Sequence, residues 1–395
     1  MFNTLADFNP QSKRIFVRGD LNVPMANGMV SDKTRLERLA PTIKALTQKG
    51  GRVIVLSHFG RPKGQRNMEM TLKPVADALG IVLGCDVAFA NDCIGNEAGA
   101  VIDSMLDGDV CVLENVRFHA GEENNNMDFA KALCENGDVY VNDAFSVSHR
   151  AHATTQAMAT ILPAYAGLNM QAELDALTSA LANPVRPVMA IVGGSKVSTK
   201  LDVLKNLVGK VDKLIIGGAM ANTFMYAKGI DIGASLCETD LSETAKTIMK
   251  NAEKSGCEII FPVDVSVASS INDGANAVQK PANDVSADDM ILDIGTTAIV
   301  DAIVQVKGSK TLLWNGPVGA FEFPPFEKGT LSIAKAVAEQ VQAGNLIAVG
   351  GGGDTVAALD MAGVKEKLTF VSTAGGAFLE WMEGKDLPGV TALKK

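Results

Sequence analysis

Short apolar runs rich in β-branched residues recur along the chain, and longer stretches with helical periodicity separate them. This alternation is typical of an α/β fold built on a mostly parallel sheet. We expect buried strands at 15–17, 53–56, 110–113 and 139–141 in the first half, and at 188–192, 214–216, 259–261, 291–292, 311–314, 346–349 and 368–371 in the second.

The length of the chain predicts two domains, because 395 residues exceed what one hydrophobic core usually supports. The strands then divide into two doubly wound α/β domains. The sequence QAELDALTSAL at 171–181 has the pattern of a helix, and Asn183-Pro184 would end it. We expect this helix to connect the two domains.

Composition and charge argue against several classes of protein. Hydrophobic residues make up 47% of the chain and charged residues 21%, as in a globular enzyme rather than a disordered or fibrous protein. A formal net charge of −9 disfavours general binding to nucleic acid or membranes. The sequence has neither a signal-peptide core nor an apolar run of membrane-spanning length, so we expect a cytoplasmic protein. The six cysteines form no C-x-x-C pair and lie far from the four histidines, which favours free buried thiols over zinc or disulfides.

The stretch 188–200 predicts a strand, a tight glycine turn and a helix. Gly193 and Gly194 would let the backbone approach a ligand, and unpaired N–H groups at a helix N-terminus attract anions. We expect Lys196 and Lys200, four residues apart, to share one face of that helix. Phosphate is the natural ligand, although the segment matches neither the P-loop nor the dinucleotide fingerprint. A glycine turn can also serve only to pack a helix on a sheet.

The two halves of the chain differ in their cations. All ten arginines lie at or before Arg186, whereas lysines continue throughout. Guanidinium groups bind carboxylate and phosphate oxygens in pairs, whereas lysine supplies a mobile point charge. We therefore expect the first half to hold a small anionic substrate and the second half a different anion.

Polar and glycine-rich motifs follow nearly every expected strand. Those of the first half are RGDLNVP from Arg18, SHFGRP from Ser57, ENVR from Glu114 and NDAF from Asn142. Those of the second half are GGSKVSTK from Gly193, GGAM from Gly217, NGPVG from Asn315, GGGGDT from Gly350 and STAGG from Ser372. Open α/β sheets bind ligands beyond the carboxyl ends of their strands, so this pattern predicts two facing sites.

Individual motifs also have simpler interpretations. Asp20 and Arg18 could form a structural ion pair, and His58 could be a hydrogen-bonded loop histidine. Asp143 and Asp354 could each cap a helix. Four consecutive glycines before Asp354 are, however, a poor choice for merely starting a helix, and the agreement among many strand ends favours binding sites.

Taken together, the motifs closely resemble those of the phosphoglycerate kinase family along almost the whole chain. The resemblance rests on the order and separation of RGDLNVP, SHFGRP, ENVRFH, VNDAF, HRAH, GGSKVSTK, WNGPVG, GGGDT and STAGG. It implies a phosphoglycerate-binding domain at 1–170, a connecting helix at 171–183, a nucleotide-binding domain at 184–377, and a tail at 378–395 that returns to the first domain. The two domains would close over one another about a hinge.

The resemblance implies reversible transfer of the acyl phosphate of 1,3-bisphosphoglycerate to Mg-ADP, giving 3-phosphoglycerate and ATP, in glycolysis and gluconeogenesis. The implied cofactor is Mg²⁺ bound with ATP or ADP, and the family is usually monomeric. Neither nucleic acid nor a membrane is an expected partner. The acceptor in the reverse direction is a carboxylate that is already ionised, so no general base is expected.

Position by position, the family pattern assigns one set of residues to the phosphoglycerate, with Arg35 closest to the transferring group. This set is Asp20, Leu21, Asn22, Arg35, His58, Phe59, Gly60, Arg61, Arg117 and Arg150. The set assigned to the nucleotide is Lys200, Gly217, Gly218, Asn315, Glu322, Gly352, Gly353, Asp354 and Thr355, with Asp354 as the expected Mg²⁺ ligand. The expected catalytic set is Arg35, Lys196, Lys200, Gly375 and Gly376. Such residues provide the positive charge and backbone N–H groups that stabilise a phosphoryl group in transfer.

Two positions depart from the family pattern. Ser146 stands where glycine is common, so the loop leading to Arg150 could be set differently. Thr296 stands where proline is frequent, which leaves the contacts at the nucleotide edge open. We expect neither residue to touch the charged residues of the site.

Two other functions stay open at this point. A non-catalytic two-domain binding protein would close on an anionic ligand without consuming nucleotide. A nicotinamide-dependent dehydrogenase would share the doubly wound fold. It would need a dinucleotide fingerprint after an early strand, and none has the right spacing.

Overall fold

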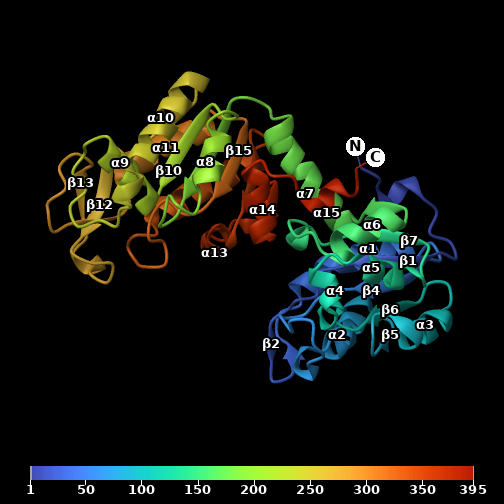
Figure 1. The fold of residues 1–395 in the computed structure, drawn as a ribbon. Helices are drawn as coiled ribbons and strands as arrows, with labels where there is room; N and C mark the ends of the chain where they lie inside the picture. The colour runs from blue at the N-terminus through green and yellow to red at the C-terminus, as the bar shows by residue number, and fades with distance from the viewer. Residues whose placement is uncertain (1, 395) are drawn as a thin grey trace. The chain divides into compact units, whose positions relative to one another are not determined.

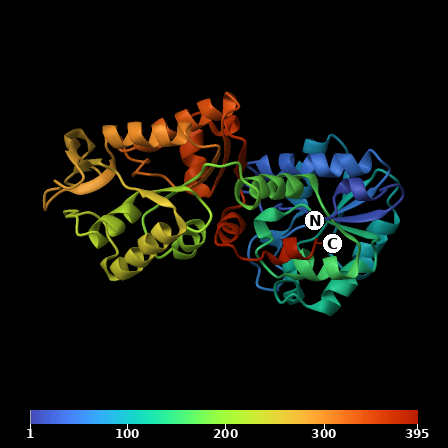
Figure 2. The same cartoon turned by 90° about the horizontal axis from the view of Figure 1, so that it is seen from above.

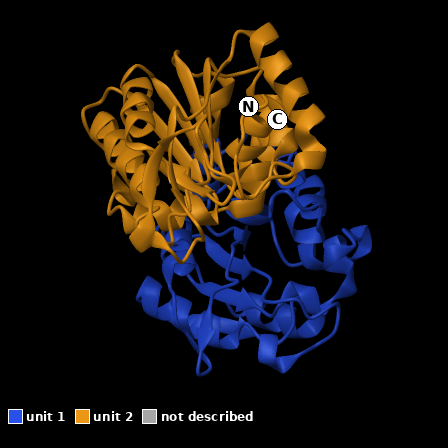
Figure 3. Ribbon diagram, turned by 90° about the vertical axis from the view of Figure 1, so that its left-hand side faces the viewer, with its two compact units in different colours: residues 1–174, 386–395 blue, residues 175–385 orange. Residues whose placement is uncertain are grey.

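The computed structural model describes residues 2–394, which divide into two compact units. Unit 1 comprises Met1–Leu174 and Asp386–Lys395, and unit 2 comprises Asp175–Lys385 (Figure 3). Each unit contains one six-stranded parallel sheet flanked by helices (Figure 1). The expected α/β class with two doubly wound sheets is thereby confirmed.

The sheet of unit 1 has the strand order β5-β6-β4-β1-β7-β8, and all neighbouring strands are parallel. Its strands are β1 (Arg14–Arg18), β4 (Arg52–Leu56), β5 (Val87–Ala90), β6 (Val110–Leu113), β7 (Val139–Asn142) and β8 (Ala164–Ala166). The chain adds β4 and β6 on one side of β1 and then moves to its other side at β7. The direction in which the chain adds strands therefore reverses between β1 and β7. Doubly wound folds bind ligands at such a reversal.

Helices cover both faces of this sheet because successive strand residues are buried on opposite sides. Ile15 and Val17 pack with α1 (Thr34–Thr47) and α2 (Lys73–Leu83), whereas Phe16 between them is buried on the other face. Burying one such side chain contributes about 1.5–3 kcal/mol. The other helices are α3 (Gly95–Asp103), α4 (Ala120–Glu123), α5 (Met127–Cys134), α6 (Met158–Ile161) and α15 (Pro388–Thr391); β2 (Met25–Ala26) and β3 (Met29–Val30) form a small hairpin.

The sheet of unit 2 has the order β11-β10-β9-β15-β16-β17 and is also parallel throughout. Its strands are β9 (Val188–Gly193), β10 (Lys213–Gly217), β11 (Glu258–Ile260), β15 (Thr311–Asn315), β16 (Ile347–Gly351) and β17 (Phe370–Ser372). Its helices are α8 (Leu201–Leu207), α9 (Ala219–Ala227), α10 (Ser242–Ser255), α11 (Thr296–Lys307), α12 (Lys328–Gln342), α13 (Gly353–Met361) and α14 (Gly375–Met382). The reversal here lies between β9 and β15.

Unit 2 also contains a three-stranded antiparallel sheet that the sequence did not predict. Its order is β13-β12-β14, formed by Val278–Pro281, Asp264–Ala268 and Met290–Ile294. The strand expected at 291–292 belongs to this sheet and not to the parallel one. The segment Asp264–Ala268 escaped notice because Ser266 interrupts its apolar residues, although four of its five residues are buried.

The expected connecting helix is present as α7 (Leu168–Leu177), which continues with π-helical geometry through Thr178–Ala182. The boundary between the units falls inside α7, after Leu174, whereas the sequence suggested a boundary at 170.

The C-terminal segment returns to unit 1 only from Asp386, later than the expected 378. Helix α14 stays in unit 2, where Asn206 Nδ2 donates to the Met382 carbonyl at 2.7 Å. In unit 1, the N–H of Gly389 donates to the Ser148 carbonyl at 2.8 Å. The two chain ends lie together there, and Phe2 and Lys394 form an antiparallel bridge (Figure 2).

Candidate active site

Basic side chains gather beyond the carboxyl ends of the strands of unit 1. Arg18 ends β1, His58 follows β4, and Arg117 lies in the 3-10 segment Val116–Phe118 after β6. Arg150 follows β7, and Arg35 lies in the first turn of α1. Burial lowers the pKa of His58 well below its usual range, and the charges of these four arginines lower it further. We call these five residues the cation cluster.

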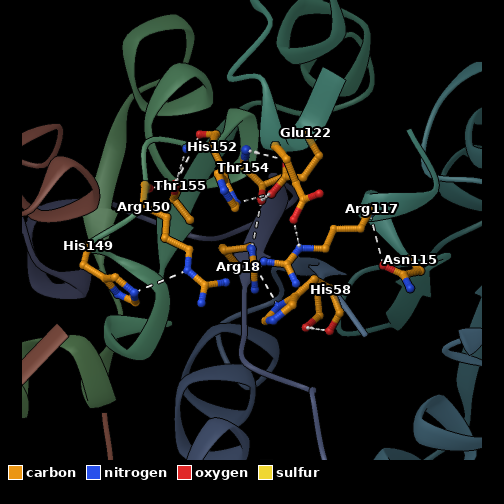
Figure 4. Close-up of polar contacts among 12 residues, drawn as sticks. Arg18, His58, Asn115, Arg117, Glu122, His149, Arg150, His152, Thr154 and Thr155 are labelled. Atoms are coloured by element: carbon orange, nitrogen blue, oxygen red, sulfur yellow. Dashed lines mark hydrogen bonds and ion pairs between the residues drawn. The ribbon is translucent and has the colours of Figure 1, made fainter. Parts of the chain in front are cut away.

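His58 lies against Arg18 in this cluster (Figure 4). Nη2 of the buried Arg18 is 3.2 Å from Nδ1 of His58. A guanidinium group can only donate, so Nδ1 accepts this hydrogen bond and the neutral ring carries its proton on Nε2. In this tautomer the remaining donor of the ring is the Nε2–H.

Asp20 pairs with Arg35, not with Arg18 as the simpler interpretation of the sequence proposed. Arg35 Nη1 lies 2.8 Å from Asp20 Oδ2 and 3.0 Å from the Asn22 carbonyl oxygen. The hydroxyl of Ser146 also donates to Asp20 Oδ2. The expectation that Ser146 touches no charged residue of the site is therefore wrong, because the serine supplies a donor that glycine lacks.

Hydrogen bonds hold the loops around the cation cluster. They run from the Gly60 N–H to Asn22 Oδ1 (2.9 Å), from the Leu21 N–H to Ser57 Oγ (2.9 Å) and from Asn115 Nδ2 to the Phe59 carbonyl (2.7 Å). Sequence reasoning did not single out Ser57 and Asn115 for this role, although both stand in motifs that follow strands. Leu21, Phe59 and Gly60 contribute through their backbone.

The remaining predicted arginines differ in burial and in their partners. Arg117 is 3% exposed, donates to the Gly60 carbonyl at 2.9 Å and lies 3.2 Å from the Glu123 carboxylate. Arg150 donates from Nε to His149 Nε2 at 3.3 Å. Arg61 is exposed, so the structure does not bring its side chain into the buried part of the cluster.

The cation cluster contains more cations than paired carboxylates. Among residues 2–394, ion pairs join Arg35 to Asp20 and Arg117 to Glu123, but Arg18 and Arg150 have no ion pair. Guanidinium groups that lack a carboxylate partner are suited to bind the oxygens of an anion.

Lys200 lies at the reversal between β9 and β15 in unit 2. Its Nζ donates to the carbonyl oxygens of Gly193 at 2.6 Å and Asn315 at 3.0 Å, which are the last residues of the two strands. Burial lowers the pKa of Lys200 to about 8, and the charge of Asp354 partly opposes this shift. A lysine held in this way places a positive charge where the sheet binds ligands.

Glycines bring the loops near Lys200 into backbone contact. A Cβ atom on Gly193 would lie 1.8 Å from the Pro317 carbonyl oxygen, and one on Gly217 would lie 2.6 Å from the Cα of Val318. Gly218 has a φ of 64°, which few other residues adopt. We call the close-packed layer formed by Gly193, Gly217 and Gly218 the glycine floor.

A cavity of about 320 Å³ adjoins the glycine floor in unit 2. Its lining includes Gly218, Met225, Leu236, Val265, Ile291 and Val318. Glu322 and Asp354 add carboxylates to this largely apolar lining. The size and lining are typical of a site for a small organic molecule.

The glycine segment before α13 also meets Asn315. Nδ2 of Asn315 donates to the Gly351 carbonyl at 2.9 Å, and a Cβ atom on Gly352 would lie 2.7 Å from Nδ2. The Gly316 N–H donates to the hydroxyl of Thr355 at 2.7 Å.

Gly353 and Asp354 lie exposed in the first turn of α13. The N-cap position is Gly352, so Asp354 is not the cap of this helix. Asp143 accepts the Met170 N–H at 2.9 Å in the first turn of α7, but it is distant from this helix in the sequence and is not its N-cap residue.

The loop between β9 and α8 differs from the prediction. Helix α8 begins at Leu201 with Lys200 at its N-cap, so Lys196 lies in the preceding loop and the two lysines do not share a helix face. The Glu238 carboxylate accepts the N–H of Ser198 at 3.0 Å and also its hydroxyl hydrogen. These bonds hold the residues before Lys200 outside the helix and leave Lys196 exposed.

Gly375 and Gly376 begin α14 in unit 2, after the N-cap Ala374. Gly375 has a φ of 37°, and no atom lies within 4 Å of the position that a Cβ atom would take. The first N–H groups of a helix have no partner within it, so this end can donate to an anion.

The sequence assigns no specific role to Asp293, although Asp293-Ile294-Gly295 stands at the expected nucleotide edge; its buried carboxylate lines the cavity. It accepts the N–H groups of Gly329 at 2.7 Å and Ile294 at 2.9 Å. Burial raises the pKa of Asp293 to about 7. Asp293 connects the antiparallel sheet to the start of α12, and no motif in the sequence marks it for this role.

Asp92, Cys93 and His119 bring metal-ligating atoms together in unit 1, all within 4.8 Å of one another. A cysteine thus lies beside a histidine, contrary to the expected separation. Asp92 Oδ1 lies 2.7 Å from His119 Nε2 and accepts the Cys93 N–H at 2.6 Å, so these groups satisfy one another. Burial raises the pKa of the Cys93 thiol, which disfavours the thiolate that a metal requires. All six cysteines are free, but Cys85 is exposed rather than buried.

None of the helices formed by residues 2–394 is both long enough and apolar enough to cross a membrane.

A family model described as phosphoglycerate kinase matches residues 5–385. Relatives named phosphoglycerate kinase include those of Methylorubrum extorquens (strain PA1), 57% identical over 394 residues, and Caulobacter vibrioides (strain NA1000 / CB15N), 56% identical over 393 residues. The alignments cover 100% of this chain and 98% and 99% of these relatives.

Two solved structures of phosphoglycerate kinases also match along their length. The one from Coxiella burnetii has a TM-score of 0.94 at 40% identity, covering 100% of this chain and 99% of that one. The one from Pyrococcus horikoshii OT3 has a TM-score of 0.80 at 30% identity, covering 100% and 98%. Sequence and fold therefore agree that the chain belongs to the phosphoglycerate kinase family of enzymes.

Proposed function

We propose that the chain transfers the acyl phosphate of 1,3-bisphosphoglycerate to Mg-ADP reversibly, giving 3-phosphoglycerate and ATP. The observation that carries this proposal is the excess of guanidinium groups over carboxylates at the sheet reversal of unit 1. Phosphoglycerate is a small acid that carries both a carboxylate and a phosphate, and the oxygens of both groups suit bidentate arginines.

In unit 1, we assign the anionic groups of the substrate to the cation cluster, with Asp20, Asn22 and Arg61 at its edge. Arg35 is the cation nearest the transferring group in this proposal. Its side chain is 42% exposed, whereas Arg18 and Arg117 are buried, so Arg35 can reach outward while its pair with Asp20 restrains it.

In unit 2, we assign the nucleotide base to the cavity beside Gly217 and Gly218, the ribose to Glu322, and the phosphates to Lys200 and the segment Gly352–Thr355. The cavity is apolar where a flat base would lie. Lys196 and the N–H groups of Gly375 and Gly376 would contact the transferred phosphoryl group, whose three outer oxygens gather negative charge.

Asp354 fits the role of a Mg²⁺ contact. Its carboxylate is exposed, lines the cavity and lies near enough to Lys200 to affect the pKa of that lysine. Mg²⁺ usually keeps several waters and shares nucleotide phosphates, so one carboxylate is a sufficient protein contribution. When bound, the ion would neutralise phosphate charge. The chain's own residues orient the two substrates, and no residue has to remove a proton because the acceptor carboxylate is ionised at neutral pH.

The two binding sites lie in different units, so transfer requires the units to close about α7 and the return of the chain at Asp386. We further propose that the enzyme acts as a cytoplasmic monomer, as the family resemblance implies.

The direct test is to incubate the protein with Mg-ATP, 3-phosphoglycerate and hydroxylamine, which traps an acyl phosphate as its hydroxamate. Hydroxamate and ADP should appear in equal amounts, and only when 3-phosphoglycerate is present. Folded protein that binds both ligands but forms neither product would contradict the proposed reaction.

A further inference from the structure

A fully buried carboxylate, Glu122, lies behind the cation cluster of unit 1. Glu122 belongs to α4 and has 0% exposure. Its Oε1 accepts the hydroxyl hydrogen of Thr154 at 2.6 Å, and its Oε2 accepts the Thr154 N–H at 2.9 Å. A buried charge is costly unless it is hydrogen-bonded and compensated, so the fold has to hold this carboxylate in place.

Thr154 connects Glu122 to Arg18. The hydroxyl has one hydrogen, which it donates to Glu122, and its oxygen remains free to accept. Arg18 Nε donates to that oxygen at 2.9 Å. Because Arg18 also contacts Nδ1 of His58, four side chains form one continuous chain of hydrogen bonds from the carboxylate to the imidazole (Figure 4).

Three separate elements position this chain of hydrogen bonds. Arg18 is the last residue of β1, Glu122 lies in α4, and Thr154 lies in the π-helical segment Ala153–Ala157. Tyr140 in β7 donates its hydroxyl hydrogen to the Thr154 carbonyl at 2.6 Å, so that segment is tied to the strand beside β1. The arrangement is therefore set by the packing of the sheet and does not depend on a flexible loop.

Two arginines lie close enough to Glu122 to act on its charge. Burial raises the pKa of Glu122, whereas Arg18 and Arg117 lower it and favour the ionised form. His152 Nδ1 lies 3.8 Å from Glu122 Oε1, but burial and the neighbouring arginines lower the pKa of His152 to about 4, so this histidine is neutral near pH 7. Arg18 forms no direct ion pair among residues 2–394. The carboxylate of Glu122 therefore supplies the negative charge near Arg18 through Thr154.

We infer that Glu122 is a positioning residue for phosphoglycerate binding. Through Thr154 it fixes the guanidinium of Arg18, and through Arg18 it fixes the neutral tautomer of His58 that presents its Nε2–H to the substrate. This inference rests on the proposed function of unit 1. Glu122 itself touches no substrate, and its effect is confined to the phosphoglycerate site.

The first test needs no substrate. Thr154→Val keeps the size of the side chain but removes the hydroxyl, whereas Thr154→Ser keeps the hydroxyl. ¹⁵N NMR of the histidine rings, assigned with His58→Gln among only four histidines, reports the tautomer of His58. The wild type and Thr154→Ser should show a proton on Nε2 and an acceptor at Nδ1. Thr154→Val should show a mixture of tautomers.

The second test measures binding and turnover. Glu122→Gln and Thr154→Val should raise the Kd and KM for 3-phosphoglycerate about 10- to 100-fold, because small displacements of binding groups have effects of this size. The KM for ATP should change less than about twofold, and Thr154→Ser should bind nearly as the wild type does. Asp128→Asn, which removes an exposed carboxylate of unit 1, is the matched charge control.

Unchanged 3-phosphoglycerate affinity in both folded variants would overturn the inference, and so would a His58 tautomer that Thr154→Val leaves unaltered. Equal changes in the KM for both substrates would also overturn it, since they would indicate a general loss of structure. If Glu122→Gln fails to fold, the affinities and His58 tautomers of Thr154→Val and Thr154→Ser still test the inference. Failure of the proposed function would appear separately, as wild-type protein that does not bind 3-phosphoglycerate at all.

Discussion

The two units place positive charge at the reversal of a parallel sheet by different means. Unit 1 uses four arginine side chains of which two, Arg18 and Arg117, are buried, and other side chains orient them, as Asp20 orients Arg35. Unit 2 uses one half-buried lysine, Lys200, that is held by backbone carbonyls beside the glycine floor.

Under the proposed function, the difference follows from the two ligands. A small acid needs many fixed donors around it, and guanidinium groups keep their charge at any accessible pH. A nucleotide is larger, and its phosphates could be approached by backbone N–H groups and by the ammonium group of Lys200. Unit 1 should therefore be sensitive to side-chain truncation, and unit 2 should be sensitive to added backbone bulk and to pH.

The largest effect is expected from Arg35→Ala. Charge supplied to a phosphoryl group in transfer is worth about a thousandfold in rate, so kcat should fall by about that factor. Steady-state assays in the direction of ATP formation measure it. Arg52→Ala is the control, because Arg52 begins β4 at the opposite end of the sheet and pairs with Asp107. Near-normal turnover by Arg35→Ala would mean that unit 1 does not act through this arginine.

Gly193→Ala tests the glycine floor. Its Cβ atom would lie 1.8 Å from the Pro317 carbonyl oxygen, and neither backbone segment can yield easily. The free energy of unfolding should fall by about 3 kcal/mol, with weaker nucleotide binding. Denaturant titration measures the change. Gly209→Ala, whose nearest neighbouring atom would lie at 3.9 Å, should be nearly neutral. Equal stability of the two variants would show that unit 2 does not depend on close backbone contact.

The pKa of Lys200, lowered to about 8 from the usual 10.5, predicts a pH effect confined to unit 2. Between these values the unfolded chain holds more protons at this site than the folded chain, so raising the pH stabilises the fold. Relative to Lys200→Met, the wild type should gain at most about 3 kcal/mol of unfolding free energy between pH 8 and 10.5. The pH profile of Arg35→Ala, which keeps Lys200, should run parallel to that of the wild type. Parallel pH profiles for the wild type and Lys200→Met would contradict the lowered pKa.

Ser146→Ala should have the smallest effect. It removes one hydrogen bond to Asp20 and leaves the pair of Asp20 with Arg35 intact. One such bond is worth about 1 kcal/mol, so the KM for 3-phosphoglycerate should rise about fivefold with kcat unchanged. Ser104→Ala serves as the control, because it removes an exposed hydroxyl that bonds only the Val101 carbonyl. A change in kcat would mean that Asp20 does more than orient Arg35.

The strands and the residues at their ends were predictable because short β-branched apolar runs such as 110–113 and 188–192, separated by helical patterns, favour buried parallel strands. Parallel strands then bring Arg18, His58 and Arg117 to the same edge without further information. The predictions that failed concerned which side chains pair with each other and where a helix begins. Nothing in the spacing indicates that Asp20 pairs with Arg35 rather than Arg18, or that Glu238 holds Lys196 out of α8.

Residues that act from behind the site were the hardest to predict. Glu122 stands in no motif and Asp293 was given no role of its own, so what each contacts follows only from burial and from the groups they face. Such contacts join segments that are far apart in the sequence, so periodicity cannot reveal them.

The return of residues 386–394 to unit 1 has a consequence for how the protein is made. Gly389 donates to Ser148 and accepts from Asn142 Nδ2 at 3.2 Å, which ties the tail to the loop that carries Arg150. A ribosome makes this tail only after all of unit 2. The first unit to leave the ribosome is therefore completed only after the second has been made, and a nascent chain cannot finish the packing around the Arg150 loop before that point.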